Sequence, residues 1–143
     1  MGFGLPAAIG AALANPEKKI ICFSGDGSIM MNIQELATLS ELGLNVTVIV
    51  LENGVLGMVR QQQKYIFGKN YSASIFSKSP DLLAIARGFG IEALDANENP
   101  DWAKTVFAAK NKKPFFVRVR IDAEEDVLPF VMAGRANIDA IVN

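Results

Sequence analysis

The segment Ile20-Ile-Cys-Phe-Ser-Gly-Asp-Gly-Ser28 gives the clearest indication of the fold of this chain. Its first half is short, apolar and β-branched at the front, which is typical of a buried strand, and Gly-Asp-Gly closes it with a turn. The next strand-like run, Val46–Leu51, is also wholly apolar and leads into Glu52-Asn53-Gly54. Because the carboxyl ends of parallel strands lie on the same edge of a sheet, we expect Asp26 and Asn53 to lie near each other.

Strand-like and helix-like segments alternate along the whole chain. Wholly apolar strands between helices predict an α/β fold, with a doubly wound, mainly parallel sheet and helices on both faces. The first expected element is a helix with no strand before it. Two possibilities therefore stay open: that the sheet lacks its first strand, and that the chain is a fragment of a longer protein. The expected strands are 19–24, 46–51, 91–95 and 115–121, and the expected helices are 5–14, 33–43, 79–90 and one from about 99.

Capping residues mark the starts of two of these helices. Ser79-Pro80 is expected to supply the N-cap and the first-turn proline of one helix, and Asn99-Pro100 those of the other. The second helix would bury a stripe of Trp102, Thr105, Val106 and Ala109. The region 54–79 shows little periodicity, so no regular element is predicted in it.

Three polar stretches are expected at the surface. Arg118 and Arg120 alternate with apolar residues in the last strand, so they are predicted to face solvent or a partner rather than to bind an anion. By composition alone, residues 61–64 fit a solvated loop and the acidic residues 122–126 a solvated turn.

Composition narrows the possible functions. The chain has 143 residues, close to the roughly 150 of one domain, and we predict a single domain over 1–143 with a tail over 121–143. A net charge of −1 argues against nucleic acid as a partner, and no segment is expected to span a membrane. The absence of histidine excludes Ser-His and Cys-His pairs. The single cysteine, Cys22, is expected to fill a strand and fits a reducing cytoplasm.

Gly25-Asp26-Gly27 has the composition of a phosphate-binding turn. Glycines let the backbone approach a ligand closely, and the helix expected beyond them would offer free N–H groups. Asp26 would repel phosphate unless a divalent cation such as Mg²⁺ lay between them, with Asn53 supplying a second oxygen. The alternative is that both Gly-Asp-Gly and Asn53-Gly54 are ordinary turns.

The spacing of these residues resembles a known signature. Gly25-Asp26-Gly27, followed after 25 residues by Asn53, is similar to the motif of thiamine diphosphate enzymes. The flanking sequence resembles the C-terminal domain of the acetolactate synthase (acetohydroxyacid synthase) catalytic subunit over essentially the whole chain. The blocks that carry this resemblance are Met1-Gly-Phe-Gly-Leu-Pro-Ala-Ala-Ile-Gly10, Asn32-Ile-Gln-Glu-Leu36, Leu56-Gly-Met-Val-Arg-Gln61 and Val127-Leu-Pro-Phe-Val131.

The resemblance implies a role for each matching residue. It implies that Mg²⁺ is held by the side chains of Asp26 and Asn53 and by the main-chain carbonyl of Val55. It implies that Met1 supports the cofactor from below and that Gly25, Gly27, Ser28, Gly57 and Met58 lie near its diphosphate. It further implies a substrate pocket lined by Met58, Val59 and Gln62.

The resemblance also implies a reaction and a larger enzyme. The reaction is decarboxylation of pyruvate and condensation with a second 2-keto acid. The activating glutamate would come from the pyrimidine-binding domain of a second subunit in a homodimer or homotetramer, so no catalytic residue is expected in this chain and the isolated chain should be inactive. A regulatory small subunit is a further expected partner, and FAD would bind a domain that this chain lacks.

Two residues depart from the family pattern, and other readings stay open. Glu52 replaces the usual asparagine before Asn53, and Gln62 replaces a tryptophan that shapes the second-substrate pocket, which leaves the choice between pyruvate and 2-ketobutyrate undecided. A related 2-keto acid decarboxylase or oxidase would share the metal site. A non-catalytic nucleotide-binding module would share the fold.

Overall fold

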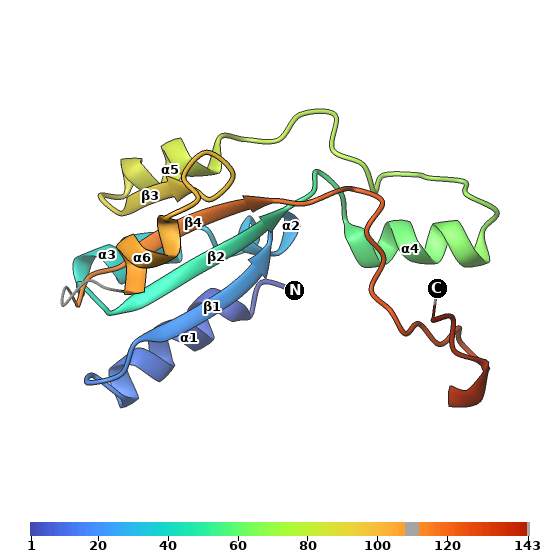
Figure 1. Cartoon of the computed structure of the whole chain (residues 1–143), viewed down its shortest axis with the longest axis horizontal. Coiled ribbons are helices and arrows are strands. Elements are labelled where there is room, and N and C mark those ends of the chain that lie inside the picture. Colours follow the sequence, from blue (N-terminus) through green and yellow to red (C-terminus); the bar gives the residue numbers. More distant parts are fainter. Residues whose placement is uncertain (108–111, 143) are drawn as a thin grey trace. The chain divides into compact units, whose positions relative to one another are not determined.

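A four-stranded parallel sheet organises the computed structural model, which describes residues 1–107 and 112–142. Each pair of neighbouring strands is parallel, as the sequence predicts. The strands are β1 (Ile20–Gly25), β2 (Val46–Glu52), β3 (Glu92–Asp95) and β4 (Phe115–Arg120), in the spatial order β1-β2-β4-β3 (Figure 1).

Helices pack on both faces of this sheet, which confirms the doubly wound α/β prediction. Successive residues of a strand point to opposite faces, so β2 contributes Val48 to one core and Ile49 to the other. The larger core includes α1 (Gly4–Ala14), α3 (Glu35–Glu41) and α5 (Leu82–Gly88), and the smaller core includes α6 (Trp102–Phe107).

Two core residues agree with the sequence patterns, but the prediction of a fully buried first strand was wrong, since Ile21 and Phe23 of β1 are 45% and 66% exposed. Cys22 is buried in the larger core, and burial raises the pKa of its thiol, as expected for a cysteine that fills a strand. Val106 is fully buried against Phe115 and Val117 in the smaller core, with Trp102 beside them. Thr105, predicted on the same stripe, is instead exposed, and Ala109 lies outside the described residues.

Two helical predictions need correction. The helix expected over 33–43 is shorter, and a separate helix, α2 (Asp26–Ile29), precedes it. The region 54–79 contains a helix that the sequence pattern did not predict, α4 (Gly57–Ile66). The side chains buried on α4 are polar, Arg60 and Gln61, and so produce no apolar period.

The start of α5 also differs from the expectation. The N-cap residue is Asp81, two residues after the predicted Ser79. The Asp81 side chain accepts hydrogen bonds of 3.1 Å from the backbone N–H groups of Leu83 and Ala84. The predicted end of this helix agrees better, since Gly90 has φ = +78°, a conformation that glycine adopts without strain.

The chain divides into two compact units, which we describe separately. Unit 1 comprises 1–53 and 79–121 and contains the sheet, and unit 2 comprises 54–78 and 122–143 and contains α4. The predicted C-terminal tail therefore packs with residues 54–78, a region in which the sequence predicts no helix or strand. Within 1–107 and 112–142, no helix has the length and apolar character needed to cross a membrane.

The α5 cap provides a test of the local structure. We expect Asp81→Ala to lower the free energy of unfolding by about 1 kcal/mol, because two backbone N–H groups lose their acceptor. Ser79→Ala, at the position that the sequence suggested, should change it by less than about 0.5 kcal/mol. Urea denaturation of both variants measures the difference. A larger loss from Ser79→Ala than from Asp81→Ala would contradict the assignment.

Candidate functional site

Asp26 lies at the carboxyl ends of two neighbouring strands. It directly follows β1, and the register of β1 and β2 pairs Gly25 with Leu51, so the strand ends lie side by side. The Asp26 Oδ2 atom accepts a hydrogen bond of 3.1 Å from the backbone N–H of Asn53, and Oδ1 accepts one of 2.7 Å from Gly27. The structure therefore brings the two predicted magnesium ligands, Asp26 and Asn53, into direct contact.

The donors at this edge are of the type that a hard cation prefers. Asp26 supplies carboxylate oxygens, Asn53 carries an amide oxygen, and the Asp26 side chain is almost fully buried. Magnesium binds through carboxylate and neutral oxygen atoms together with oxygens of its phosphate ligand. In the part of the chain that the structure describes, no group of three or more His, Cys, Asp or Glu side chains could hold a metal. The residues at the β1–β2 edge therefore fit magnesium held jointly with a phosphate ligand.

The N-terminal residues are tied to the same edge of unit 1. The Gly2 backbone N–H donates a hydrogen bond of 3.0 Å to Ser28 Oγ, and Asn32 Nδ2 donates one of 2.7 Å to the Gly2 carbonyl. Met1 directly precedes Gly2, which bonds to Ser28, and Met1 itself is 71% exposed. The helix that starts at Asp26 has only four residues, so its dipole contributes less to anion binding than the longer helix expected from the sequence.

The other predicted site residues belong to unit 2. Val55 is buried and forms an antiparallel bridge with Ile75, and Gly57 begins α4. An open groove of about 520 Å³ on this unit is lined by Val59 and Gln62 together with Gln63, Phe67 and Asn70. Met58 is exposed and does not line that groove.

Polar side chains of α4 form hydrogen bonds with the C-terminal segment at Asp126 and Val127. Gln61 is only 2% exposed, and its side chain exchanges two hydrogen bonds with the backbone of Val127: Nε2 donates to the carbonyl at 3.0 Å, and Oε1 accepts from the N–H at 2.8 Å. Lys64 and Tyr65 donate to Asp126 Oδ2 at 2.5 and 2.8 Å. Residues 61–64 all belong to α4, so the interpretation of this stretch as a loop was wrong, and Gln61 is not solvated either.

Asp126 corrects a second surface prediction. Its side chain is buried within unit 2, whereas the sequence suggested a solvated acidic turn. The hydrogen bond from Lys64 holds the pKa of Asp126 below its ordinary value, although burial opposes this, and the same carboxylate raises the pKa of Tyr65. The sequence contained one indication of these contacts. Gln61 and Tyr65, which bind the backbone of Val127 and the side chain of Asp126, are four residues apart and would lie on the same side of a helix.

Residues 1–119 match the family described as thiamine pyrophosphate enzyme, C-terminal TPP binding domain. The chain belongs to this family. It is 49% identical over 142 residues to the acetolactate synthase isozyme 1 large subunit of Escherichia coli K12, a match that covers 99% of this chain and 25% of that protein. It is 39% identical over 141 residues to the acetolactate synthase of Arthrospira platensis, covering 97% of this chain and 24% of that protein.

A solved structure supports the same fold. The thiamine diphosphate-dependent 4-hydroxybenzoylformate decarboxylase of Rhodococcus jostii RHA1 is similar with a TM-score of 0.75 and 31% identity, over 85% of this chain and 23% of that one. This TPP-binding domain spans about a quarter of the length of the relatives that it matches. The family resemblance and the thiamine diphosphate-binding fold expected from the sequence are confirmed.

The TPP-binding domain also contains a charge cluster that the sequence did not predict. Arg118 donates to Asp95 Oδ2 at 2.6 Å, and Arg120 donates to the same oxygen at 2.8 Å. Arg118 is largely buried, so the prediction that it faces solvent was wrong. The register of the folded sheet explains the contact: Asp95 pairs with Arg118 across β3 and β4, which places opposite charges side by side.

These contacts shift the pKa values of the cluster. Burial alone would raise the pKa of Asp95, but the hydrogen bonds from Arg118 and from the Asn97 backbone, with the charges of both arginines, hold it below its ordinary value. Burial lowers the pKa of Arg118, and Asp95 and Glu52 more than compensate. Both groups are therefore charged at neutral pH.

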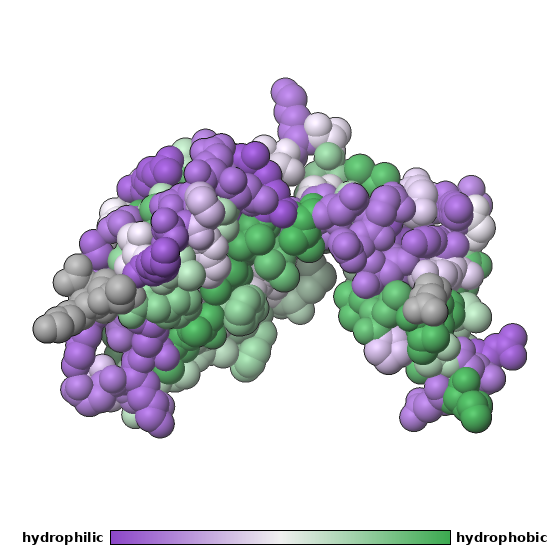
Figure 2. Space-filling model, in the orientation of Figure 1, coloured by the Kyte–Doolittle hydropathy of each residue, from purple (hydrophilic) through white to green (hydrophobic). Residues whose placement is uncertain are grey.

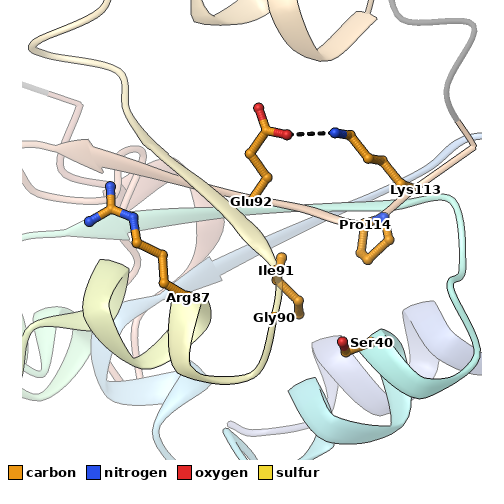
Figure 3. Close-up of a pocket in the computed structure, with 7 residues that line it drawn as sticks. All are labelled: Ser40, Arg87, Gly90, Ile91, Glu92, Lys113 and Pro114. Carbon is orange, nitrogen blue, oxygen red and sulfur yellow. Dashed lines mark hydrogen bonds and ion pairs between the residues drawn. The ribbon is translucent and has the colours of Figure 1, made fainter.

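A pocket of unit 1 lies at the opposite edge of the sheet from Asp26. It has a volume of about 470 Å³ and lies where β3 and β4 begin (Figure 3). Its charged groups are already engaged: Lys113 pairs with Glu92 at 2.6 Å, and Arg87 donates to the Ala93 carbonyl at 3.0 Å. In Figure 3 Arg87 points away from the Glu92–Lys113 pair, so these groups do not converge on a ligand.

Only one of two neighbouring glutamines of α4 contacts the C-terminal segment, so we expect their substitutions to have unequal effects on stability. Gln61→Ala should lower the free energy of unfolding by about 1–3 kcal/mol, because two part-buried hydrogen bonds to the Val127 backbone are lost, each contributing about 0.5–1.5 kcal/mol. Gln62→Ala, on the exposed side of the same helix, should change it by less than about 0.5 kcal/mol. Urea denaturation and hydrogen exchange of the Val127 amide measure both effects. Unchanged exchange at Val127 in Gln61→Ala would refute the contact.

Proposed function

We propose that this chain is the thiamine diphosphate- and magnesium-binding domain of an acetolactate synthase large subunit. The contact between Asp26 and Asn53 at the ends of β1 and β2 carries this proposal, because it joins the two residues that a cation would need. The 49% identity to the E. coli large subunit over 99% of the chain supports the same enzyme.

Particular residues would hold the two groups. The side chains of Asp26 and Asn53 and the carbonyl of Val55 would bind Mg²⁺, whose charge offsets the repulsion between Asp26 and a diphosphate. Met1 would support the cofactor. The diphosphate would lie against Gly25, Gly27, Ser28, Gly57 and Met58.

The chemistry belongs largely to the cofactor, and the protein supplies orientation and electrostatics. When bound, thiamine diphosphate provides the carbanion chemistry that removes CO₂ from a 2-keto acid and joins the remainder to a second one. The chain itself would fix the cofactor at Asp26 and orient the keto acids. Met58, Val59 and Gln62 would contact the pyruvate and the second keto acid, and the groove beside Val59 and Gln62 supports a role in substrate binding.

The complete enzyme would need partners. The activating glutamate would come from the pyrimidine-binding domain of a second subunit, in a cytoplasmic homodimer or homotetramer with a regulatory small subunit, and FAD would bind elsewhere. Met1 and Phe3 are 71% and 79% exposed, and Gly2 between them bonds to Ser28, so apolar surface lies next to the cofactor edge. Figure 2 shows further hydrophobic surface on unit 1. Such surface supports coverage by a second subunit. The product would enter branched-chain amino acid biosynthesis.

One alternative keeps the cofactor and changes the reaction. The similarity to a 4-hydroxybenzoylformate decarboxylase, at 31% identity, favours a related 2-keto acid decarboxylase or oxidase as the second candidate. A non-catalytic nucleotide-binding module would bind no thiamine diphosphate in a magnesium-dependent way.

Cofactor binding gives the direct test. Calorimetric titration of the chain with thiamine diphosphate should show binding with Mg²⁺ and none after chelation of the metal. Asp26→Ala should abolish binding, and Asn53→Ala should weaken it by about tenfold or more, because each removes an oxygen ligand. Asp101→Ala, an exposed acid, serves as the control. Binding that survives both EDTA and Asp26→Ala would contradict the metal site.

The reaction is tested by product analysis. A chimera in which residues 1–143 replace the matching quarter of the E. coli isozyme 1 large subunit should convert pyruvate to acetolactate. The same chimera with Asp26→Ala should be inactive, because the cofactor is no longer held. Acetaldehyde or acetyl phosphate as the main product would favour the decarboxylase or oxidase alternative.

A further inference from the structure

A cluster of four charged residues lies at the carboxyl ends of β2, β3 and β4. This strand-end cluster consists of Glu52, Asp95, Arg118 and Arg120. Arg118 and Arg120 both donate to Asp95 Oδ2, at 2.6 and 2.8 Å, and the Nε atoms of the same arginines lie 3.7 and 4.0 Å from Glu52 Oε2. The register explains the arrangement, since Glu52 pairs with Arg120 and Asp95 pairs with Arg118.

Glu52 balances the charge of this cluster. Asp95 Oδ1 accepts a hydrogen bond of 2.9 Å from the Asn97 backbone, so both arginines compete for its other oxygen. The Asp95, Arg118 and Glu52 side chains are 4%, 14% and 15% exposed, and an excess positive charge there would be poorly solvated. Two other acids lie nearby: Glu98 is 3.5 Å from Arg120 but largely exposed, so it compensates little, and the charge of Asp81 also acts on Arg118 but comes after those of Glu52 and Asp95.

Glu52 also connects the cluster to the candidate cation site. Its carbonyl accepts a hydrogen bond of 3.0 Å from the Ile121 backbone, which attaches it to the end of β4. The next residue, Asn53, donates its backbone N–H to Asp26. Residues 52 and 53 are therefore held from opposite sides, Glu52 by the end of β4 and Asn53 by Asp26.

We propose that Arg118 and Arg120 are positioning residues for the cation site and act through Glu52. They hold the Glu52 carboxylate on the β4 side, which keeps Asn53 in contact with Asp26 and neutralises a negative charge that would otherwise repel a diphosphate. The inference rests on the proposed function for the ligand, although the effect on Asn53 does not require it. It also accounts for a glutamate at position 52, where the family usually has asparagine.

A double-mutant cycle tests the inference in the full chain. Arg118→Gln should weaken binding of thiamine diphosphate with Mg²⁺ by about fivefold or more, as expected for coupled neighbours, and by less than about twofold when Glu52→Asn is also present. The loss should thus depend on Glu52. Arg87→Gln, an arginine outside the cluster, is the control and should have no effect. An equal loss with and without the Glu52→Asn substitution, or no loss in either case, would overturn the inference.

A measurement without ligand separates this inference from the proposed function. Hydrogen exchange of the Asn53 amide in the ligand-free chain should speed up by about fivefold in Arg118→Gln, relative to the Val48 amide in the core, and much less in the Glu52→Asn background. If the wild type binds no thiamine diphosphate but Asn53 responds in this way, the proposed function fails and the positioning role stands. If binding occurs and Asn53 does not respond, only the positioning role fails.

Removal of Arg118 could unfold the chain, because it leaves the buried Asp95 carboxylate with fewer partners. Arg120→Gln avoids this difficulty, since Arg120 is half exposed and Asp95 keeps its contacts with Arg118. It should raise Asn53 exchange and weaken binding in the same direction as Arg118→Gln, and again only with Glu52 present. Identical behaviour of Arg120→Gln and the wild type in both measurements would overturn the inference.

Discussion

The Asp26 carboxylate joins the ends of two parallel strands, and the rest of the site depends on this contact. Its two oxygens accept backbone hydrogen bonds from Gly27 and Asn53, so the turn after β1 and the end of β2 are held together. The contact requires β1 and β2 to be neighbours in parallel register, which the buried faces of both strands enforce. A carboxylate held in this way is preorganised for a hard cation.

The end of β2 is constrained from its other side as well. Glu52 lies beside β4, where Arg118 and Arg120 share the Asp95 carboxylate. Four strands therefore contribute to one edge of the sheet: β1 through Asp26, β2 through Glu52 and Asn53, β3 through Asp95, and β4 through its arginines. Because several of these charges are poorly exposed, their partners matter more than those of surface ion pairs.

Unit 2 is organised by a different principle. Its helix α4 buries Gln61 rather than a row of apolar residues. The Gln61 side chain forms two hydrogen bonds with the backbone of the C-terminal segment. Such a helix has no apolar period, which is why the sequence pattern did not reveal it. The same contacts bury Asp126, an acid that composition assigns to the surface. These residues could be recognised only once the two separate segments of unit 2 were seen together.

The parallel α/β fold, the family and the proximity of Asp26 and Asn53 could all be predicted from the amino-acid sequence. These features follow from local patterns: apolar β-branched runs, glycine turns at their ends and a fixed spacing between two polar residues. The tertiary structure alone decided the N-cap at Asp81, the burial of Gln61 and Asp126, and the sharing of Asp95 by two arginines. Each of these depends on which polar groups meet after folding, because a polar residue can be buried when a distant segment supplies its hydrogen-bond partner.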